Sequence, residues 1–216
     1  MGRNGVFKIS NRPEDFGLLF LWCQPQRGFK TGELAFSDPV AQVGEYAATW
    51  PTPLALISPV DNQGKTEFDV CTQLPGNWVT PNSGQFRLLL NCNPLKGFMN
   101  GIEGAWFGIP NDLDNGIFLP SSGYREYTEG LYYGGMEVGR YWASSCPRDP
   151  YDRYGTSLIF DRTNPIMVYD HYRRNEAYSI RPVKSASYVW DGNPITKDFV
   201  ELGGVKWAKG NVTGYK

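Results

Sequence analysis

Side chains that could bind a ligand gather in two polar, aromatic segments of the chain, Cys146–Tyr154 and Asp161–Asn175. Tyr and Arg are frequent in both, and each supplies a large contact area with directed hydrogen bonds, which is why they dominate the energetics of interfaces. The segments indicate a candidate recognition surface for a protein or a glycan, exposed and without metal, with a merely solvated connection between strands as the alternative. Its candidate residues are Arg148, Asp149, Tyr151, Asp152, Arg153, Arg162, Asn164, Tyr169, His171, Tyr172 and Arg173.

Catalysis has fewer candidates. A nucleophilic mechanism needs a nucleophile, a base and a group that orients the base. The sequence contains one histidine, His171, and Cys146 is the cysteine nearest to it along the chain. A Cys146–His171 pair stays open as the site of an enzyme, but we favour an exposed histidine and a small residue in a turn. A phosphate-binding glycine loop is also missing from the sequence, so we expect no enzymatic activity.

Metal ligands are equally sparse, and we expect no cofactor. The cysteines form no Cys-x-x-Cys pair, which argues against structural zinc, and we favour free thiols over disulfides for Cys23, Cys71, Cys92 and Cys146. The loop Asn111–Gly116 is rich in side-chain oxygens. It could bind calcium or could be capped by its own Asx side chains. We favour the second reading, because no glutamate follows at the spacing of a calcium loop.

Composition limits the class of protein. A chain of 216 residues can form one domain with a substantial core or two small ones, and its many Trp, Tyr, Phe, Gly and Pro residues favour a loop-rich β or α+β domain. The net charge of −1, with both signs interspersed, gives no basic face for nucleic acid. No apolar run approaches the roughly 20 residues of a membrane span. Met1–Gly5 begins no apolar signal segment, so we expect either a protein that remains inside its cell or a chain without its leader.

The candidate residues must be positioned by short strands, which the stretch Ile117–Val183 contains in number. Apolar runs separated by Gly, Pro and Ser predict a sheet built from residues 117–125, 141–145, 156–161, 166–171 and 177–183. Within these strands we expect Trp142 to lie in the core. We expect Arg181, which precedes Pro182, to hold a buried carbonyl or carboxylate.

The first half of the chain predicts one helix and one hairpin. The helix covers about residues 81–92, with Thr80 as its N-cap and with Phe86, Leu89 and Leu90 on an apolar face. The hairpin covers residues 96–108 and turns at Asn100 and Gly101. Residues 6–10 predict a strand, residues 11–15 a turn or helix start, and residues 16–22 a buried run. Residues 24–66 predict long ordered loops, packed by Phe29, Phe36, Tyr46 and Trp50.

A family resemblance rests on several motifs in a fixed order. Residues 118–125 read FLPSSGYR, residues 139–145 GRYWASS, residues 157–160 SLIF and residues 178–183 YSIRPV. Upstream, residues 11–17 read NRPEDFG and residues 75–81 PGNWVTP. Together they resemble the Fibrobacter succinogenes major paralogous domain, over about residues 6–183. The resemblance implies a single, loop-rich α+β domain of the C-type-lectin-like fold with a small antiparallel sheet. Formylglycine-generating enzymes and the variable proteins of diversity-generating retroelements share that fold.

The resemblance also implies a function. The two polar segments correspond to the ligand face of the resembled retroelement proteins, which favours a recognition surface over a solvated connection. Such domains are common in secreted and surface proteins of Bacteroidetes-type bacteria, so we expect an adhesin-like, ligand-binding domain of a surface, pilus-associated or phage-tail protein. The location is then extracellular or on the cell surface, or alternatively the phage virion. The late cysteine pair of formylglycine-generating enzymes is not matched, since only Cys146 is late. The motifs of calcium-dependent sugar-binding lectins are also missing from the sequence. An enzyme derived from the formylglycine-generating fold and a structural repeat of a stalk remain the alternatives.

The far end of the chain departs from the family order. Residues 198–212 read DFVELGGVKWAKGNV and resemble the family's opening strand, which in the family precedes the PEDYG motif. This order implies a circular permutant or one unit of a tandem array. We therefore expect a domain at residues 1–183, a linker at 184–197 and a strand at 198–216 that completes the sheet of this or a neighbouring copy. Within this chain, the strand should pair near residues 179–183.

Overall fold

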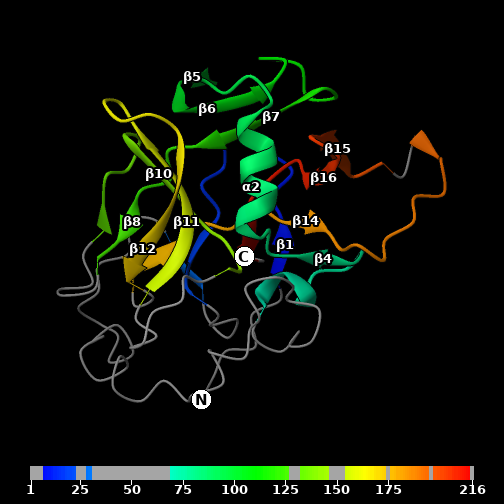
Figure 1. Cartoon of the computed structure of the whole chain (residues 1–216), viewed down its shortest axis with the longest axis horizontal. Helices are drawn as coiled ribbons and strands as arrows, with labels where there is room; N and C mark the ends of the chain where they lie inside the picture. The colour runs from blue at the N-terminus through cyan, green and yellow to red at the C-terminus, as the bar shows by residue number, and fades with distance from the viewer. Residues whose placement is uncertain are drawn as a thin grey trace.

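The computed structural model describes residues 7–22, 28–30, 69–126, 132–145, 154–173, 176–194 and 197–214. In these ranges the chain forms small antiparallel sheets around one α-helix, α2 (Ser83–Leu90), with a short 3-10 helix, η6 (Val70–Gln73) (Figure 1). The expected α+β class with antiparallel sheets is therefore confirmed. None of the helices in this part of the chain has the length and apolar character that a membrane crossing requires.

The described strands fall into five sheets. One contains β1 (Phe7–Ile9) and β17 (Val212–Gly214), and a second contains, in order, β10 (Val138–Trp142), β11 (Tyr154–Asp161) and β12 (Met167–Arg173). The third is β3 (Gly28–Lys30), β2 (Leu18–Leu21), β13 (Ala177–Tyr178), β8 (Tyr124–Arg125) and β9 (Tyr132–Tyr133). The fourth is β15 (Phe199–Leu202), β16 (Val205–Ala208), β14 (Val183–Lys184) and β4 (Trp78–Val79), and the fifth is β5 (Leu95–Met99), β6 (Ile102–Gly108) and β7 (Gly116–Pro120).

The predicted strands exist, but they do not form the single sheet that we expected. Residues 117–125 are divided between β7 and β8, and residues 177–183 between β13 and β14, so each segment serves two different sheets. Single parallel bridges, Gly123 to Gly139 and Tyr141 to Ser179, connect the separate sheets. The prediction was wrong here because an apolar run shows that a segment is extended, but not which strands are its neighbours.

The helix is where the sequence predicted it, but its cap is different. Asn82 is the N-cap: its side chain accepts a hydrogen bond from the Gln85 N–H, and the Gln85 side chain accepts one from the Asn82 N–H, both at 2.8 Å. Thr80 instead donates its N–H and its hydroxyl to the buried Asp69 carboxylate at 2.8 and 2.7 Å. The predicted cap was wrong because the helix begins at Ser83, so Asn82, the residue directly before it, supplies the capping side chain.

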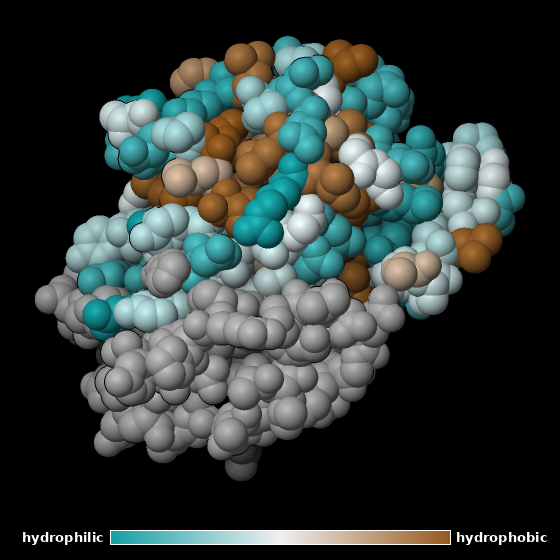
Figure 2. Space-filling view, in the orientation of Figure 1, coloured by the Kyte–Doolittle hydropathy of each residue, from teal (hydrophilic) through white to brown (hydrophobic). Residues whose placement is uncertain are grey.

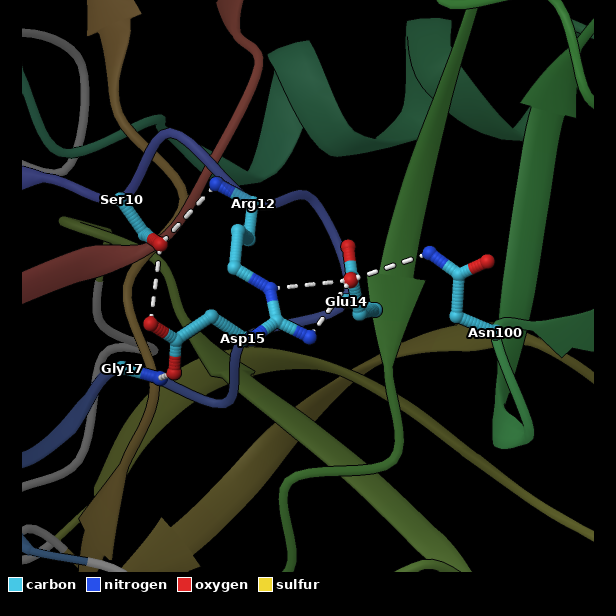
Figure 3. Close-up of polar contacts among 6 residues, drawn as sticks. All are labelled: Ser10, Arg12, Glu14, Asp15, Gly17 and Asn100. Atoms are coloured by element: carbon cyan, nitrogen blue, oxygen red, sulfur yellow. Dashed lines mark hydrogen bonds and ion pairs between the residues drawn. The ribbon is translucent and has the colours of Figure 1, made fainter.

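The hairpin β5–β6 turns at the predicted residues. Asn100 and Gly101 have φ of 50° and 81°, as a two-residue hairpin of this type requires. The polar turn near the N-terminus contacts this hairpin. Glu14 lies between Arg12 and Asn100, and its carboxylate accepts from the Asn100 side chain at 3.0 Å and from Arg12 at 2.9 Å (Figure 3). Asp15 accepts from Ser10 in the same turn, at 2.9 Å.

The hydrophobic core lies on both faces of the β10–β11–β12 sheet. Adjacent residues of a strand point to opposite faces. Trp142 accordingly belongs to a cluster with Trp22, Trp78 and Tyr178, while its neighbour Tyr141 belongs to the cluster beneath α2. Trp142 is 1% exposed, so its predicted place in the core is confirmed. The expected buried run near residue 20 is present at residues 19–22, whereas Phe16 and Leu18 are half-buried.

The C-terminal segment pairs within this chain. It forms the hairpin β15–β16, turned by Gly203 and Gly204, and β16 pairs with β14 through Trp207 and Val183. The expected pairing near residues 179–183 is therefore present, in the form of a hairpin and the further strand β17 rather than one strand. The division into domain, linker and completing strand stays a prediction.

Arg181 fixes this segment from inside the protein. Its fully buried guanidinium donates to the carbonyl oxygens of Phe118 at 2.7 Å and Ala208 at 3.2 Å, and to Pro13 at 3.4 Å. Burial lowers its pKa to about 10. The predicted role of Arg181, to hold a buried carbonyl, is confirmed, and three separate parts of the chain are joined by one side chain.

Candidate functional site

Several predicted site residues lie outside the described residues. These are the members of the first polar segment, Arg148, Asp149, Tyr151, Asp152 and Arg153. Cys146, half of the alternative catalytic pair, also lies outside, as do Cys23 and the expected packing residues Phe36, Tyr46 and Trp50. For Phe29 and His171 the structure describes only the backbone, in β3 and β12. The described candidates therefore belong to the second segment, Asp161–Asn175.

Arg162 and Asn164 lie in the turn between β11 and β12, and both are engaged there. The Asp161 carboxylate accepts hydrogen bonds from the Asn164 N–H and side chain, each at 2.7 Å, and from Thr163, and these bonds hold the pKa of Asp161 far below its usual range, although burial opposes them. Arg162 pairs with Glu103 at 2.9 Å and with Glu137 at 3.5 Å. Both residues thus stabilise the turn.

The remaining candidates lie along the same hairpin, away from that turn. Met167 is opposite Ile159 beside the turn, whereas Arg173 is opposite Tyr154 at the other end. A strand advances about 3.3 Å per residue, so Arg173 lies about 20 Å from the turn. Arg162 and Asn164 therefore lie at the opposite end of this hairpin from Arg173, and the predicted recognition surface stays a prediction.

A β-bulge brings the two predicted tyrosines of β12 together. Ser157 is opposite Tyr169 and Gly155 is opposite Tyr172, so two steps along β11 match three along β12. In a regular strand, the side chains of residues 169 and 172 would lie on opposite faces of the sheet. The bulge adds one residue to β12 relative to β11, and both side chains therefore lie on the same face. Their ring centroids are 5.1 Å apart. Asp170, inside the bulge, accepts a hydrogen bond from the Thr156 hydroxyl at 2.9 Å.

Arg140 lies at the centre of the surface that these tyrosines join. Its guanidinium is 3.5 Å from the ring centroid of Tyr124 and 4.4 Å from that of Tyr172, so the cation lies between two aromatic faces. It pairs with the Glu176 carboxylate at 2.9 Å and donates to the Tyr178 hydroxyl at 2.9 Å. The Tyr178 hydroxyl in turn donates to Glu176.

These contacts shift the ionisation of the buried pair. Burial alone would lower the pKa of Arg140, but the neighbouring phenols and the Glu176 carboxylate outweigh burial, and the pKa of Arg140 is raised. Burial also raises the pKa of Glu176, although the hydrogen bond from Tyr178 and the charge of Arg140 oppose that shift. Arg140 is thus a permanent cation whose charge is used inside the protein.

We call the resulting arrangement the tyrosine row: Tyr133, Tyr124, Arg140, Tyr172 and Tyr169. The rings of Tyr133 and Tyr124 are stacked 5.9 Å apart at one end, and those of Tyr172 and Tyr169 are 5.1 Å apart at the other. The row crosses from β9 and β8 in one sheet to β10 and β12 in another. Tyr133 and Tyr169 are 40% and 41% exposed at its ends. Tyr172, which we expected to be exposed, is half-buried because it packs against Arg140 and Tyr178.

A buried aromatic layer supports the row. Trp142 and Tyr178 are stacked with their ring centroids 4.0 Å apart, and Tyr178 contacts both Tyr124 and Tyr172 edge to face. The Trp142 indole N–H donates to the Phe20 carbonyl at 2.8 Å, which fixes its plane. The inner rings of the row are therefore held in place before any ligand arrives.

Sequence reasoning found Tyr169 and Tyr172 but missed Tyr124, Tyr133 and Arg140. One signal was present for Arg140: it lies two residues before the core residue Trp142 on the same strand, and period-two alternation places both on one face. A charged residue on a core-facing position needs a partner. No comparable local signal marks Tyr133, because its neighbours come from other strands.

The other chemical groups of the described chain serve its structure. Cys71 and Cys92 are free thiols, and burial raises the pKa of Cys71 well above its usual value, which keeps it protonated and unreactive. In the loop at residues 111–116, the Asp112 carboxylate accepts from the Asp114 N–H at 2.9 Å and from the Asn115 side chain at 2.9 Å, as an Asx-capped loop does. Within the described ranges, no cluster of three or more His, Cys, Asp or Glu residues could hold a metal ion.

Comparison with known proteins gives no match: no family model, no curated protein and no solved structure matches the chain.

Proposed function

We propose that the chain is a non-catalytic, adhesin-like domain that binds a protein or a glycan through the tyrosine row, without a metal. The observation that carries this proposal is the sandwich of Arg140 between Tyr124 and Tyr172, extended at each end by a tyrosine that is about 40% exposed. A row of aromatic rings that leads from the core to solvent has the composition of a binding surface rather than of a core.

Preorganisation supports the proposal. Ordering a flexible side chain on binding costs about 0.5–1.5 kcal/mol. In the tyrosine row this ordering is already done for Tyr124 and Tyr172, because Arg140 and Tyr178 contact both rings. The charged groups at the row, Arg140 and Glu176, are engaged with each other, which suits a scaffold better than acid–base chemistry.

The finer identity of the fold belongs to the same proposal. We infer a C-type-lectin-like domain from the order of the motifs, and we place it outside the cell or on the cell surface, with a phage virion as the alternative. The pairing of β16 with β14 and of β17 with β1 supports a family opening strand that has moved to the far end of the chain. The motif residues Arg140, Trp142 and Arg181 all make contacts that maintain the domain.

The test compares three proteins on combined glycan and protein arrays: the wild type, a Tyr133→Ala/Tyr169→Ala double variant and a Phe98→Ala control. Phe98 is an aromatic residue of β5 that is 64% exposed and lies outside the row. We expect the wild type and the control to bind the same ligands equally, and the double variant to bind at least tenfold more weakly. Equal binding by all three proteins would contradict the proposal.

A further inference from the structure

Charges of both signs lie at the tyrosine row. Among the described residues that act on Glu176, Arg140 and Arg173 are positive and Glu126 is negative. Asp170, beside the row, pairs with Arg87 of α2 at 3.7 Å. The described row thus presents aromatic rings and hydroxyls, with charged groups of both signs beside them.

Arg140 is not available to an anion. Both faces of its guanidinium are covered by rings, its Nη1 is bonded to Glu176 and Tyr178, and only 15% of the side chain is exposed. A phosphate or sulfate group would have to break the buried ion pair, which would leave the Glu176 charge uncompensated. Arg140 therefore does not favour an anionic ligand, and the rings of the row suit a ligand that makes contact mainly through C–H groups and hydroxyls.

Exposed aliphatic side chains lie on other elements of the described chain as well as beside the row. The exposed Leu and Ile residues, Leu88, Leu95 and Ile109, lie on α2, on β5 and just after β6, whereas the exposed Met167 lies on β12, two residues before Tyr169. In Figure 2 the strongly hydrophobic residues of this view gather in its upper half, whereas the area at the left, over β8 and β12, is pale to teal.

We propose that the tyrosine row binds a neutral glycan chain, with successive sugar rings lying along the row. This inference rests on the proposed function and names its ligand class. The negatively polarised face of a tyrosine ring attracts the polarised C–H groups on one side of a sugar ring, and its hydroxyl can bond to those of the sugar. Because the row joins four rings from two sheets, it suits a chain better than a single sugar.

The experiment titrates the whole chain with neutral oligosaccharides of increasing length, from one to six residues, taken from glucan, mannan and xylan series. Calorimetry or chemical-shift changes give the Kd. We expect at least one series to bind with an affinity that rises with length and then levels off. Between 50 and 500 mM salt its Kd should change less than twofold, because no ion pair forms between ligand and protein.

Matched variants locate the binding. Tyr169→Ala and Tyr133→Ala should each weaken binding by about tenfold, a loss of the size that aromatic contacts supply, whereas Tyr169→Phe should lose less and Phe98→Ala nothing. A thermal melt of each variant checks that it is folded.

Three results would overturn the inference: no binding by any neutral series, binding only to a sulfated or phosphorylated glycan with strong salt dependence, or binding to a peptide or protein that Tyr169→Ala abolishes. The last result would leave the proposed function intact. If no glycan, peptide or protein on the arrays bound the chain, both the proposed binding function and the neutral-glycan inference would be contradicted.

Discussion

Val183 and Trp207 are directly opposite each other on β14 and β16, although 23 residues separate them in the sequence. The Trp207 ring is fully buried and packs against Phe86 of α2 at a centroid distance of 5.6 Å. The C-terminal hairpin is therefore a part of the core that is built beneath the helix, and the stability of the domain depends on it.

Truncation of the chain after Asn193 should therefore unfold it. The cut removes Trp207 and its neighbours and exposes the apolar cluster beneath α2. A full-length Trp207→Ala variant should lose about 3–5 kcal/mol in urea unfolding. The control Val189→Ala changes a residue that is 87% exposed and should stay within about 0.5 kcal/mol of the wild type. A truncated chain that remained folded, monomeric and equally stable would show that the hairpin is dispensable.

The cap of α2 can be tested by two alanine substitutions. Asn82→Ala removes the side chain that accepts from the Gln85 N–H and should cost about 1 kcal/mol of unfolding free energy. Ser83→Ala, one residue further on, is the control and should cost less, since the side chain of residue 83 is not the cap. A larger loss in the control than in Asn82→Ala would reverse the assignment.

Acid should remove the contribution of Asp161. The pKa of this carboxyl is lowered in the folded chain by hydrogen bonds from Thr163 and Asn164. The stabilising effect of the ionised Asp161 carboxylate is therefore complete above the pKa that this carboxyl has in the unfolded chain, about 3.9. The effect is lost as the pH falls below that value towards the lower pKa of the folded state. The difference in unfolding free energy between wild type and Asp161→Ala should be constant from pH 7 to pH 5 and should shrink towards pH 2. An equal difference at pH 7 and pH 2 would contradict this account.

The ion pair between Arg140 of the tyrosine row and Glu176 should show strong coupling in unfolding free energy. Arg140→Met leaves Glu176 buried without its cation, and breaking a buried pair in this way costs about 3 kcal/mol. Adding Glu176→Gln removes the unpaired charge and should recover a large part of that loss. A double-mutant cycle by urea unfolding gives the coupling energy. Additive losses in the double variant would mean that the pair is too well solvated to matter.

Local signals in the sequence were sufficient for much of the fold. Asn100 and Gly101 are the residues that a two-residue hairpin requires, and Phe86 with Leu89 gave the buried face of α2. The cap was missed because Thr and Asn are both preferred N-cap residues, and only the structure shows that the helix begins at Ser83. A single sheet was expected because strand propensity is local, whereas pairing is decided by the whole chain.

The candidate site was less predictable for two reasons. The register shift opposite Gly155 and Ser157, which places Tyr169 beside Tyr172, is invisible in an alternation pattern. Tyr124 and Tyr133 also come from a different sheet, so only the assembled protein shows that they continue the row. Composition could indicate that tyrosine and arginine would carry recognition, but not which of them would meet.

The pairing of β1 with β17 has a mechanical consequence. Phe7 is opposite Gly214 and Ile9 is opposite Val212, so the two strands run antiparallel with residues 7 and 214 at the same end. A pulling force applied between those two residues would separate β1 from β17 by breaking their hydrogen bonds one after another, which requires little force. The opening should stop at Asn211, whose side chain bonds to the Phe16 carbonyl and to the Tyr141 hydroxyl. Optical tweezers attached at positions 7 and 214 should record an early, small extension before the domain unfolds. The tyrosine row would stay assembled while β1 and β17 are separated.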